Sequence, residues 1–198
     1  GEWEVVPIGL DEEFIAKIPA LYHVIEAADI AALLPSRERF AHKGTFGHAM
    51  LITGSTGKMG AAVLSTRAAT RSGAGLVTVH VPADGLSILQ SAAPEAMGSA
   101  DLDPDRITAL PVLEGMTAIG IGPGLGAAED SQQVVKKVLQ FAVCPIVVDA
   151  DGLNAIAANP TWGAFLPSGT ILTPHPKEFD RLAGTPSTSS YDRLQRCR

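Results

Sequence analysis

Short apolar runs alternate with amphipathic stretches along this chain from about residue 45 onward. The alternation is typical of βαβ units. The apolar runs contain few polar residues, which is expected for strands that helices cover on both faces. The predicted strands are 49–53, 76–81, 117–121, 145–149 and 170–173, and the predicted helices are 59–72, 84–92, 130–141, 151–158 and 176–183. The sequence therefore predicts an α/β fold with a mostly parallel central sheet and helices on both faces.

The composition limits the classes of partner. A chain of 198 residues, 46% of them hydrophobic, is large enough to bury a sizeable core. The net charge is −6 and no basic stripe is present, which argues against nucleic acid as a partner. No apolar run reaches the ~18 residues of a membrane span, and the first residues lack a signal peptide's pattern. We therefore expect a cytoplasmic protein that does not bind membranes.

The two ends of the chain differ from its middle. Residues 1–10, GEWEVVPIGL, read as a strand, and a linker-like region follows around residues 20–42, so this part is expected to belong to another domain. Residues 184–198 read as a loop and the first turns of a helix. Because no glycine or proline stop signal ends that helix, we expect the chain to be cut off there.

Two glycine-rich segments each follow a predicted strand. In the first, a strand leads into Gly54-Ser55-Thr56-Gly57, and a helix begins shortly afterwards. Free N–H groups at such a helix start favour an anionic or nucleotide-like ligand. The spacing matches neither the dinucleotide fingerprint nor the Walker pattern, so an ordinary tight turn is an equal alternative. The second segment, 119–126, contains four glycines and indicates either close approach to its backbone or a plain loop.

Polar side chains follow the last two predicted strands. Asp149 and Asp151 lie where the fourth strand becomes a helix, with Asn154 one turn further on. Helix capping is sufficient to explain Asp151, whereas Asp149 needs solvent, a ligand hydroxyl, metal-bound water or a neighbouring loop as its partner. His175, between Pro174 and Pro176, is fixed at the mouth of the sheet, where it is either structural or a hydrogen-bond donor to a ligand.

Other catalytic patterns are absent from the sequence. We find no Ser-His-Asp ordering and no nucleophile elbow. Cys144 and Cys197 form neither a disulfide framework nor a metal site. The remaining histidines, His23, His42, His48 and His80, are scattered, so a surface or packing role is expected for each.

The segments together, in this order, resemble the ADP- or ATP-dependent NAD(P)H-hydrate dehydratases, which have a ribokinase-like fold. The resemblance covers roughly residues 30–198. It rests on KGTFG (43–47), Gly54-Ser55 with Gly60-Ala61-Ala62, RSGAGLVTV (71–79), PEAMG (94–98), GPGLG (122–126), DADGLN (149–154) and LTPHPKEF (172–179).

The resemblance implies repair of a damaged cofactor. Such enzymes use ATP or ADP, with Mg²⁺, to phosphorylate the hydroxyl of an NAD(P)H hydrate, and phosphate is then eliminated. It implies that Ala62, Gly124 and His175 contact the hydrate, and the other candidate ligand-binding residues are Gly54, Ser55, Asp149 and Asn154. By the same resemblance, residues 1–29 are the tail of a preceding epimerase domain with its linker, and residues 30–198 are a partial dehydratase domain.

The resemblance also implies that catalytic groups are missing. The family's Gly-x-Gly-Asp segment, which supplies an anion hole and a base, does not occur in this sequence. We therefore name no catalytic residue and expect these 198 residues alone to have no dehydratase activity. The alternatives are a ribokinase-like small-molecule kinase, acting on a sugar or vitamin precursor, and a non-catalytic nucleotide-binding module. We also expect small-molecule nucleotides as ligands, and homo-oligomers that cover exposed sheet edges.

Overall fold

The computed structural model describes residues 4, 6, 8–34 and 36–197. The chain divides into two compact units, Gly1–Phe40 and Ala41–Arg198. The expected division into an epimerase tail over residues 1–29 and a partial dehydratase domain over residues 30–198 remains a prediction.

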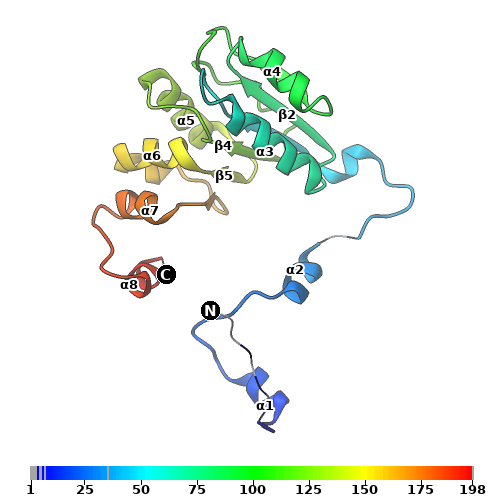
Figure 1. Ribbon diagram of the computed structural model, residues 1–198, viewed down its shortest axis with the longest axis vertical. Helices are drawn as coiled ribbons and strands as arrows, with labels where there is room; N and C mark the ends of the chain where they lie inside the picture. The colour runs from blue at the N-terminus through cyan, green and yellow to red at the C-terminus, as the bar shows by residue number, and fades with distance from the viewer. Residues whose placement is uncertain (1–3, 5, 7, 35, 198) are drawn as a thin grey trace. The chain divides into compact units, whose positions relative to one another are not determined.

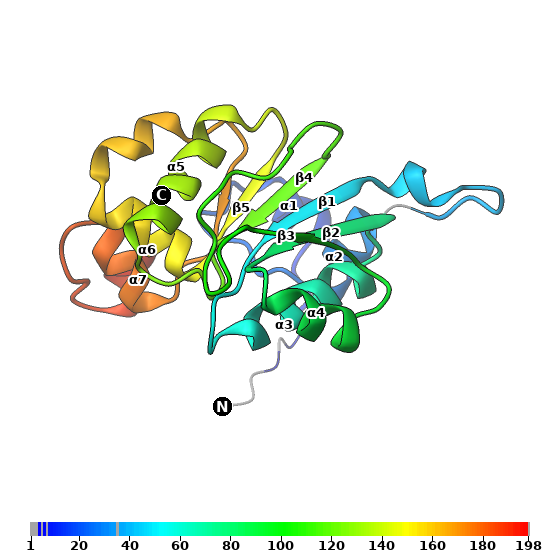
Figure 2. The ribbon, with the colours of Figure 1, turned by 90° about the horizontal axis from the view of Figure 1, so that it is seen from above.

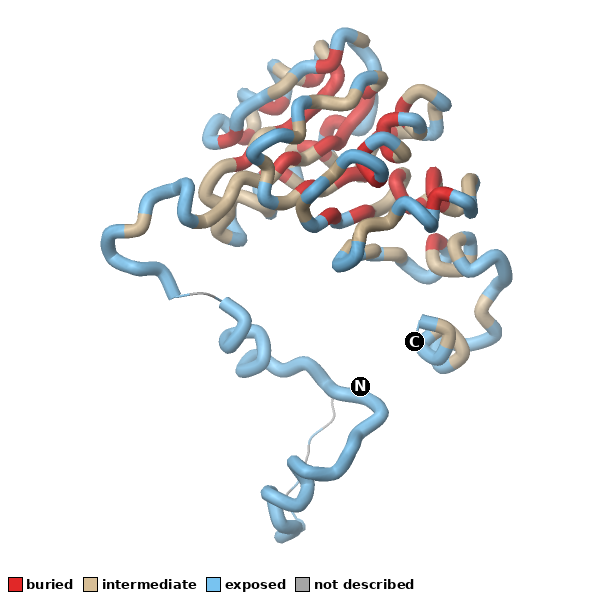
Figure 3. The backbone as a smooth tube through the Cα atoms, turned by 180° about the vertical axis from the view of Figure 1, so that it is seen from behind, coloured by how far each residue is buried: buried red, intermediate tan, exposed pale blue. Residues whose placement is uncertain are grey.

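The first unit contains two short helices, α1 (Glu12–Lys17) and α2 (Ala27–Leu33). Asp11 caps α1 by accepting a hydrogen bond from the Phe14 N–H at 3.0 Å. All described residues of this unit are exposed, as the pale blue tube shows (Figure 3). The predicted strand over residues 1–10 lies partly outside the described residues, and residues 4, 6 and 8–10 do not form one. The expected linker around 20–42 contains α2, which the sequence analysis missed.

The second unit is built on a six-stranded sheet in the order β3-β2-β1-β4-β5-β6. Figure 1 labels β2, β4 and β5 of this sheet. Every neighbouring pair is parallel, which confirms the predicted α/β fold. Five strands lie within one or two residues of their predicted bounds, and β3 was not predicted. The strands are β1 (His48–Ile52), β2 (Leu76–Val81), β3 (Met97–Ala100), β4 (Ala118–Ile121), β5 (Ile146–Val148) and β6 (Ile171–Leu172).

Helices connect most of these strands, and each of the five predicted helices is present. The helix over 151–158 begins one residue earlier than predicted, and the expected C-terminal helix is α8. The helices of this unit are α3 (Met59–Arg71), α4 (Gly85–Ala92), α5 (Glu129–Phe141), α6 (Ala150–Ala158), α7 (Pro176–Leu182) and α8 (Ser190–Arg196), with 3₁₀ turns η1 (Lys43–Phe46) and η2 (Pro160–Phe165).

Two hydrophobic cores lie on opposite faces of the sheet. Val77, Val79 and Val81 of β2 pack with α3 and α4 on one face. Met50 and Ile52 of β1 belong to the other core, with residues of β4, β5, α5 and α6. This division follows from the period of two in a strand, which sends alternate side chains to opposite faces. Figure 2 shows α3 and α4 on one side of the sheet and α5 on the other. The expected helices on both faces are confirmed.

Glycines bring the connection after β4 close to the start of α6. Gly122 has φ of 129°, and a Cβ on it would lie 1.8 Å from the Asp149 carbonyl oxygen. A Cβ on Gly152 would lie 2.8 Å from Cγ1 of Val148 and 3.2 Å from Cα of Gly122. The close approach expected for the segment 119–126 is therefore made, at Gly122, by the protein's own backbone.

A buried carboxylate, Asp101, fixes the long connection between β3 and β4. It accepts hydrogen bonds from the N–H groups of Asp103, Thr108 and Ala109 at 2.7 to 3.0 Å. Burial alone would raise the pKa of Asp101, but these hydrogen bonds outweigh it and hold the pKa well below its usual range. Asp101 is therefore ionised across the physiological range.

His80 on β2 lies against this carboxylate. The His80 Nε2 is 3.3 Å from Oδ2 of Asp101, and its Nδ1 is 3.0 Å from the Ser99 hydroxyl. Burial of the ring lowers the pKa of His80, and the opposing influence of Asp101 does not restore it. The packing role expected for His80 agrees with its burial, and in the neutral ring one nitrogen donates to Asp101 while the other accepts from Ser99.

The contact at Gly122 gives a first prediction. Gly122→Ala should lower the free energy of unfolding by about 3–5 kcal/mol, because the new methyl group adds positive-φ strain and a collision with backbone. Gly57→Ala is the matched control, since Gly57 also has positive φ but open space at its Cβ position. It should cost only about 1–2 kcal/mol. Urea unfolding measures both, and equal losses would contradict the packing argument.

The buried imidazole gives a second prediction, on pH. Because the pKa of His80 is lowered in the folded state, the unfolded chain binds a proton there first as the pH falls below about 6.5. Stability should therefore decrease with acidification below that pH, by at most about 1.4 kcal/mol per pH unit from this residue. His80→Gln, which keeps a donor toward Asp101 but does not titrate, should flatten the dependence between about pH 6.5 and 5. An unchanged slope in urea unfolding would show that His80 does not contribute.

Candidate functional site

The crevice between the ends of β1 and β4 is the point where the chain order in the sheet reverses. From β1 the order runs one way to β2 and β3, and from β4 it runs the other way to β5 and β6. Open α/β sheets bind ligands at such a switch point, outside the carboxyl ends of the strands. Both glycine-rich segments lie here, as the turns 53–58 and 122–128.

The two turns are hydrogen-bonded to each other. The N–H of Gly54 donates to the Pro123 carbonyl at 2.9 Å. The Ser55 hydroxyl donates to the Gly124 carbonyl at 2.7 Å. Three of the predicted ligand-binding residues, Gly54, Ser55 and Gly124, are thereby brought together, although their contact with a ligand remains a prediction.

The fourth residue of this group, Ala62, lies beneath the first turn. A Cβ on Gly54 would lie 3.3 Å from the Ala62 Cβ, and Ala62 itself is a fully buried residue of α3. Its neighbour Ala61 faces the other turn, because a Cβ on Gly124 would lie 3.1 Å from the Ala61 Cβ. Ala62 thus supports the turn from below, and its predicted contact with the hydrate remains a prediction.

Asp151 joins both turns to the start of α6. Its Oδ2 accepts from the Gly126 N–H at 2.8 Å and lies 3.3 Å from Nζ of Lys58. The N-cap of α6 is Asp149, so the explanation of Asp151 as a cap was wrong. Asp151 instead pairs with Lys58 of the first turn, and the spacing of these two residues in the sequence does not reveal the pairing. The ion pair is partly exposed and therefore contributes little stability.

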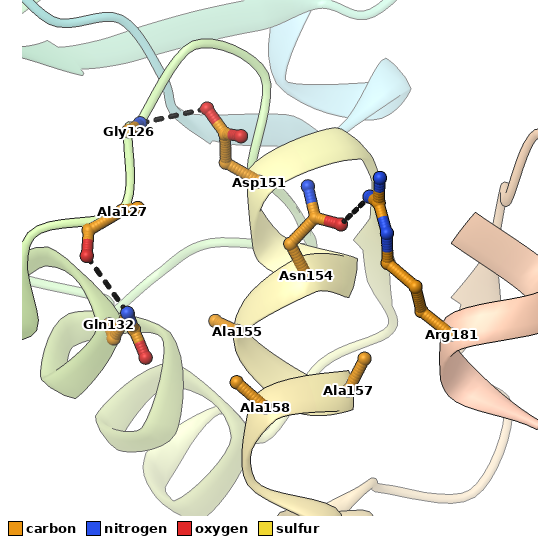
Figure 4. Close-up of a pocket in the computed structure, with 9 residues that line it drawn as sticks. All are labelled: Gly126, Ala127, Gln132, Asp151, Asn154, Ala155, Ala157, Ala158 and Arg181. Carbon is orange, nitrogen blue, oxygen red and sulfur yellow. Dashed lines mark hydrogen bonds between the residues drawn. The ribbon is translucent and has the colours of Figure 1, made fainter. Parts of the chain in front are cut away.

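A cavity of about 580 Å³ lies beside Asp151, between α6, α7 and the turn after β4. Asn154 lines it and accepts a hydrogen bond from Nη1 of Arg181 at 2.6 Å, as the dashed line in Figure 4 shows. Gln132 closes another side by donating to the Ala127 carbonyl. The remaining lining is alanine and glycine. The cavity thus combines one cation, one carboxylate and amide groups, which suits a polar, partly anionic ligand; Arg181 was not predicted.

Asp149 lines a different cavity, of about 540 Å³, on the face of the sheet that carries α3. Thr53 and Thr173, at the ends of β1 and β6, line it as well. The Thr53 hydroxyl is buried and has no hydrogen-bond partner among the described residues. Asp149 is half-buried and makes no capping bond with its side chain. Asp149 and Asn154, predicted together, therefore face separate cavities.

His175 caps α7. Its Nδ1 accepts from the N–H groups of Lys177 at 3.1 Å and Glu178 at 3.3 Å. The buried Glu178 completes a capping box by accepting from the His175 N–H at 2.9 Å, and its other oxygen lies 3.2 Å from the His175 Nε2. The structural alternative for His175 is therefore present in the fold. The ring is more than half exposed, so its role as a donor to the hydrate stays a prediction.

Two findings concern metals and membranes. Among the described residues, no group of three or more His, Cys, Asp or Glu side chains is arranged to hold a metal ion. None of the helices in the described part of the chain is long and apolar enough to cross a membrane.

Two curated proteins that are similar to this chain are named for NAD(P)H hydrate. It is 38% identical over 184 residues to the bifunctional NAD(P)H-hydrate repair enzyme of Coxiella burnetii, covering 93% of this chain and 36% of that protein. It is 37% identical over 157 residues to the ADP-dependent (S)-NAD(P)H-hydrate dehydratase of Bacillus subtilis, covering 79% of this chain and 54% of that protein. The chain thus spans only part of the length of these relatives.

Solved structures agree with these relatives. An ADP/ATP-dependent NAD(P)H-hydrate dehydratase from B. subtilis, co-crystallized with ATP/Mg²⁺, matches with a TM-score of 0.67 and 34% identity, covering 85% of this chain and 57% of that one. A ribokinase-like superfamily protein from Enterococcus faecalis matches with a TM-score of 0.69 and 30% identity, covering 81% and 57%. The ribokinase-like fold is confirmed. Because the family model described as NAD(P)H-hydrate dehydratase also matches residues 49–198, this chain belongs to the NAD(P)H-hydrate dehydratase family.

Proposed function

We propose that this chain forms the hydrate-binding part of an ATP- or ADP-dependent (S)-NAD(P)H-hydrate dehydratase, a lyase that restores NAD(P)H. The observation that carries the proposal is the pair of turns at the switch point, joined by the Ser55–Gly124 hydrogen bond. These turns lie within the residues that match the family, and they contain Gly54-Ser55 and GPGLG (122–126), two of the segments that resemble it.

In this proposal the described residues bind and orient rather than react. Gly57 and Gly126 leave open space at the two turns, so a ligand can approach their backbone closely. The cavity with Arg181, Asn154 and Asp151 adds groups that recognise phosphate and hydroxyl oxygens. The hydroxyl of the hydrate would be phosphorylated by the nucleotide before phosphate leaves.

Asp149 fits the magnesium ion that accompanies such a nucleotide. Magnesium in nucleotide sites usually keeps several waters and takes one or two carboxylates together with phosphate oxygens. Asp149 lines a cavity, and its carboxylate makes no capping bond that would compete for it. Its part would be to hold the ion's hydration shell, and the ion would supply charge neutralisation at the phosphates.

The partners expected from the sequence belong to the same proposal. In this proposal the chain binds small-molecule nucleotides, and it binds neither nucleic acid nor membranes. Copies of the chain associate with one another. The exposed Val147 and Ile171 on the two outermost strands of one sheet edge support association, because exposed apolar strands favour it. The cytoplasmic location also remains a prediction.

The function is tested by turnover of the hydrate. The full-length product of the gene should regenerate NADH, followed by its absorbance, from (S)-NADH hydrate with ATP or ADP and Mg²⁺. The 198 residues alone should give no measurable rate, because the sequence holds no Gly-x-Gly-Asp segment. Phosphorylation of hydroxymethyl or sugar substrates without hydrate turnover would instead identify a small-molecule kinase. Turnover by the 198 residues would refute the assignment of the catalytic groups.

His175 allows its two roles to be separated. In the full-length product, His175→Ala should weaken hydrate binding about three- to tenfold, the worth of one neutral hydrogen bond, and leave nucleotide binding nearly intact. His175→Asn is the matched variant, because asparagine caps a helix well but lacks the outer ring nitrogen. Calorimetric titration should show the same loss of hydrate affinity in the His175→Asn variant as in the His175→Ala variant. Normal hydrate affinity in the Asn variant would mean that His175 serves only as a cap.

A further inference from the structure

The connection between β3 and β4 is hydrogen-bonded to the turns that follow β1 and β2. The carbonyl of Asp105 accepts from the Thr56 N–H at 2.7 Å, and its carboxylate accepts from the Thr56 hydroxyl at 2.8 Å. The carbonyl of Asp103 accepts from the Ala83 N–H at 3.0 Å, and that of Pro104 from the Asp84 N–H at 3.3 Å. Residues 101–109, which we call the tie segment, therefore touch the turns after β1 and β2.

The tie segment is also joined to the helix that follows β4. Nε of Arg106 donates to Oδ2 of Asp130 at 2.8 Å, and this hydrogen bond lowers the pKa of Asp130. The Ser131 hydroxyl donates to the Ile107 carbonyl at 2.7 Å, in a fully buried position. The tie segment thus bridges the starts of α3, α4 and α5.

Three aspartates in the sequence Asp101-Leu-Asp103-Pro-Asp105 give the tie segment its shape. Asp101 holds the N–H of Asp103, and Oδ1 of Asp103 accepts from the N–H groups of Asp105 at 2.9 Å and Arg106 at 3.1 Å. Asp105 in turn holds Thr56. Each of these carboxylates accepts hydrogen bonds that restrain the next residue named. The buried Asp101 is thereby linked through Asp103 and Asp105 to the first glycine-rich turn.

We propose that the tie segment is a positioning element, which holds the turn 53–58 in the conformation that binds the ligand. Thr56 directly follows Ser55, and two hydrogen bonds to Asp105 restrain it, one from its backbone and one from its side chain. The glycines on both sides of this pair, Gly54 and Gly57, have positive φ and little conformational restraint of their own. The ligand-binding part of this inference rests on the proposed function; the restraint of the turn does not.

Asp103 is the residue on which to test this, because it does not contact Thr56 directly and is only partly buried. Asp103→Ala removes the acceptor that orients Asp105. Asp103→Asn keeps a side-chain oxygen that accepts the same two N–H groups, and is the matched control. A melting curve for each variant checks that the protein is folded.

Amide hydrogen exchange measures the restraint in the 198-residue chain. Asp103→Ala should speed exchange of the Thr56 amide by about five- to tenfold, as expected for the loss of one hydrogen bond, and Asp103→Asn should stay within about twofold of the parent. The amide of Leu139, in the core of α5, should not change in either variant. An unchanged Thr56 amide in the folded Asp103→Ala variant would overturn the proposal.

Ligand binding is measured in the full-length product with ATP, ADP and (S)-NADH hydrate as probes. Asp103→Ala should weaken the binding of at least one of these probes about three- to tenfold, and it should raise the KM for that probe while leaving kcat nearly unchanged. Asp103→Asn should show the affinity and the KM of the parent protein. Faster exchange at Thr56 with unchanged affinity for all three probes would overturn the role in ligand binding. If the parent protein binds none of them, the proposed function fails, and the exchange experiment alone decides whether the tie segment restrains the turn.

Discussion

The parallel pairing of β1 with β4 is the constraint on which the rest of the site depends. Because crossovers between parallel strands are right-handed, reversing the strand order at this pair sends α3 and α5 to opposite faces of the sheet. The two following turns are left facing each other above the strand ends. The Gly54–Pro123 and Ser55–Gly124 hydrogen bonds form across that gap, and Asp151 closes it from the side of α6.

The glycines at this edge serve two different purposes. Gly122 has no room for a side chain, because the carbonyl oxygen of Asp149 lies against it, and a Cβ on Gly124 would be in tight contact with Lys58 and Ala61. Gly57 and Gly126 have open space where a Cβ would lie, or nearly so. The glycine-rich pattern is therefore first a requirement of folding, and only the second pair leaves backbone that a ligand can approach. A motif read from the sequence cannot separate these purposes, because both require the same residue.

The sequence predicted the elements whose signal is local. Strands such as β5, Ile146-Val147-Val148, are continuous apolar runs, but β3 is Met97-Gly98-Ser99-Ala100, short and mostly exposed, so neither hydrophobicity nor alternation marks it. The glycine-rich turns, Ser55 and His175 were likewise found from local patterns. The pairs Lys58–Asp151 and His80–Asp101 were not predicted, because each joins residues that are far apart in the chain. Asp149 and Asn154 were grouped by sequence, yet the change from strand end to helix turns them toward different cavities.

The cap at α7 limits how His175 can meet a ligand. Its Nδ1 accepts from two backbone N–H groups, so turning the ring would leave both without that acceptor at the start of a short helix. The Nε2 contact with Glu178 is easier to exchange, because Glu178 keeps its bond to the His175 backbone through the other oxygen. With Nδ1 as acceptor, the neutral ring carries its proton on Nε2. A ligand would therefore accept a hydrogen bond from the Nε2 of His175, in place of one carboxylate oxygen of Glu178, while the cap stays in place.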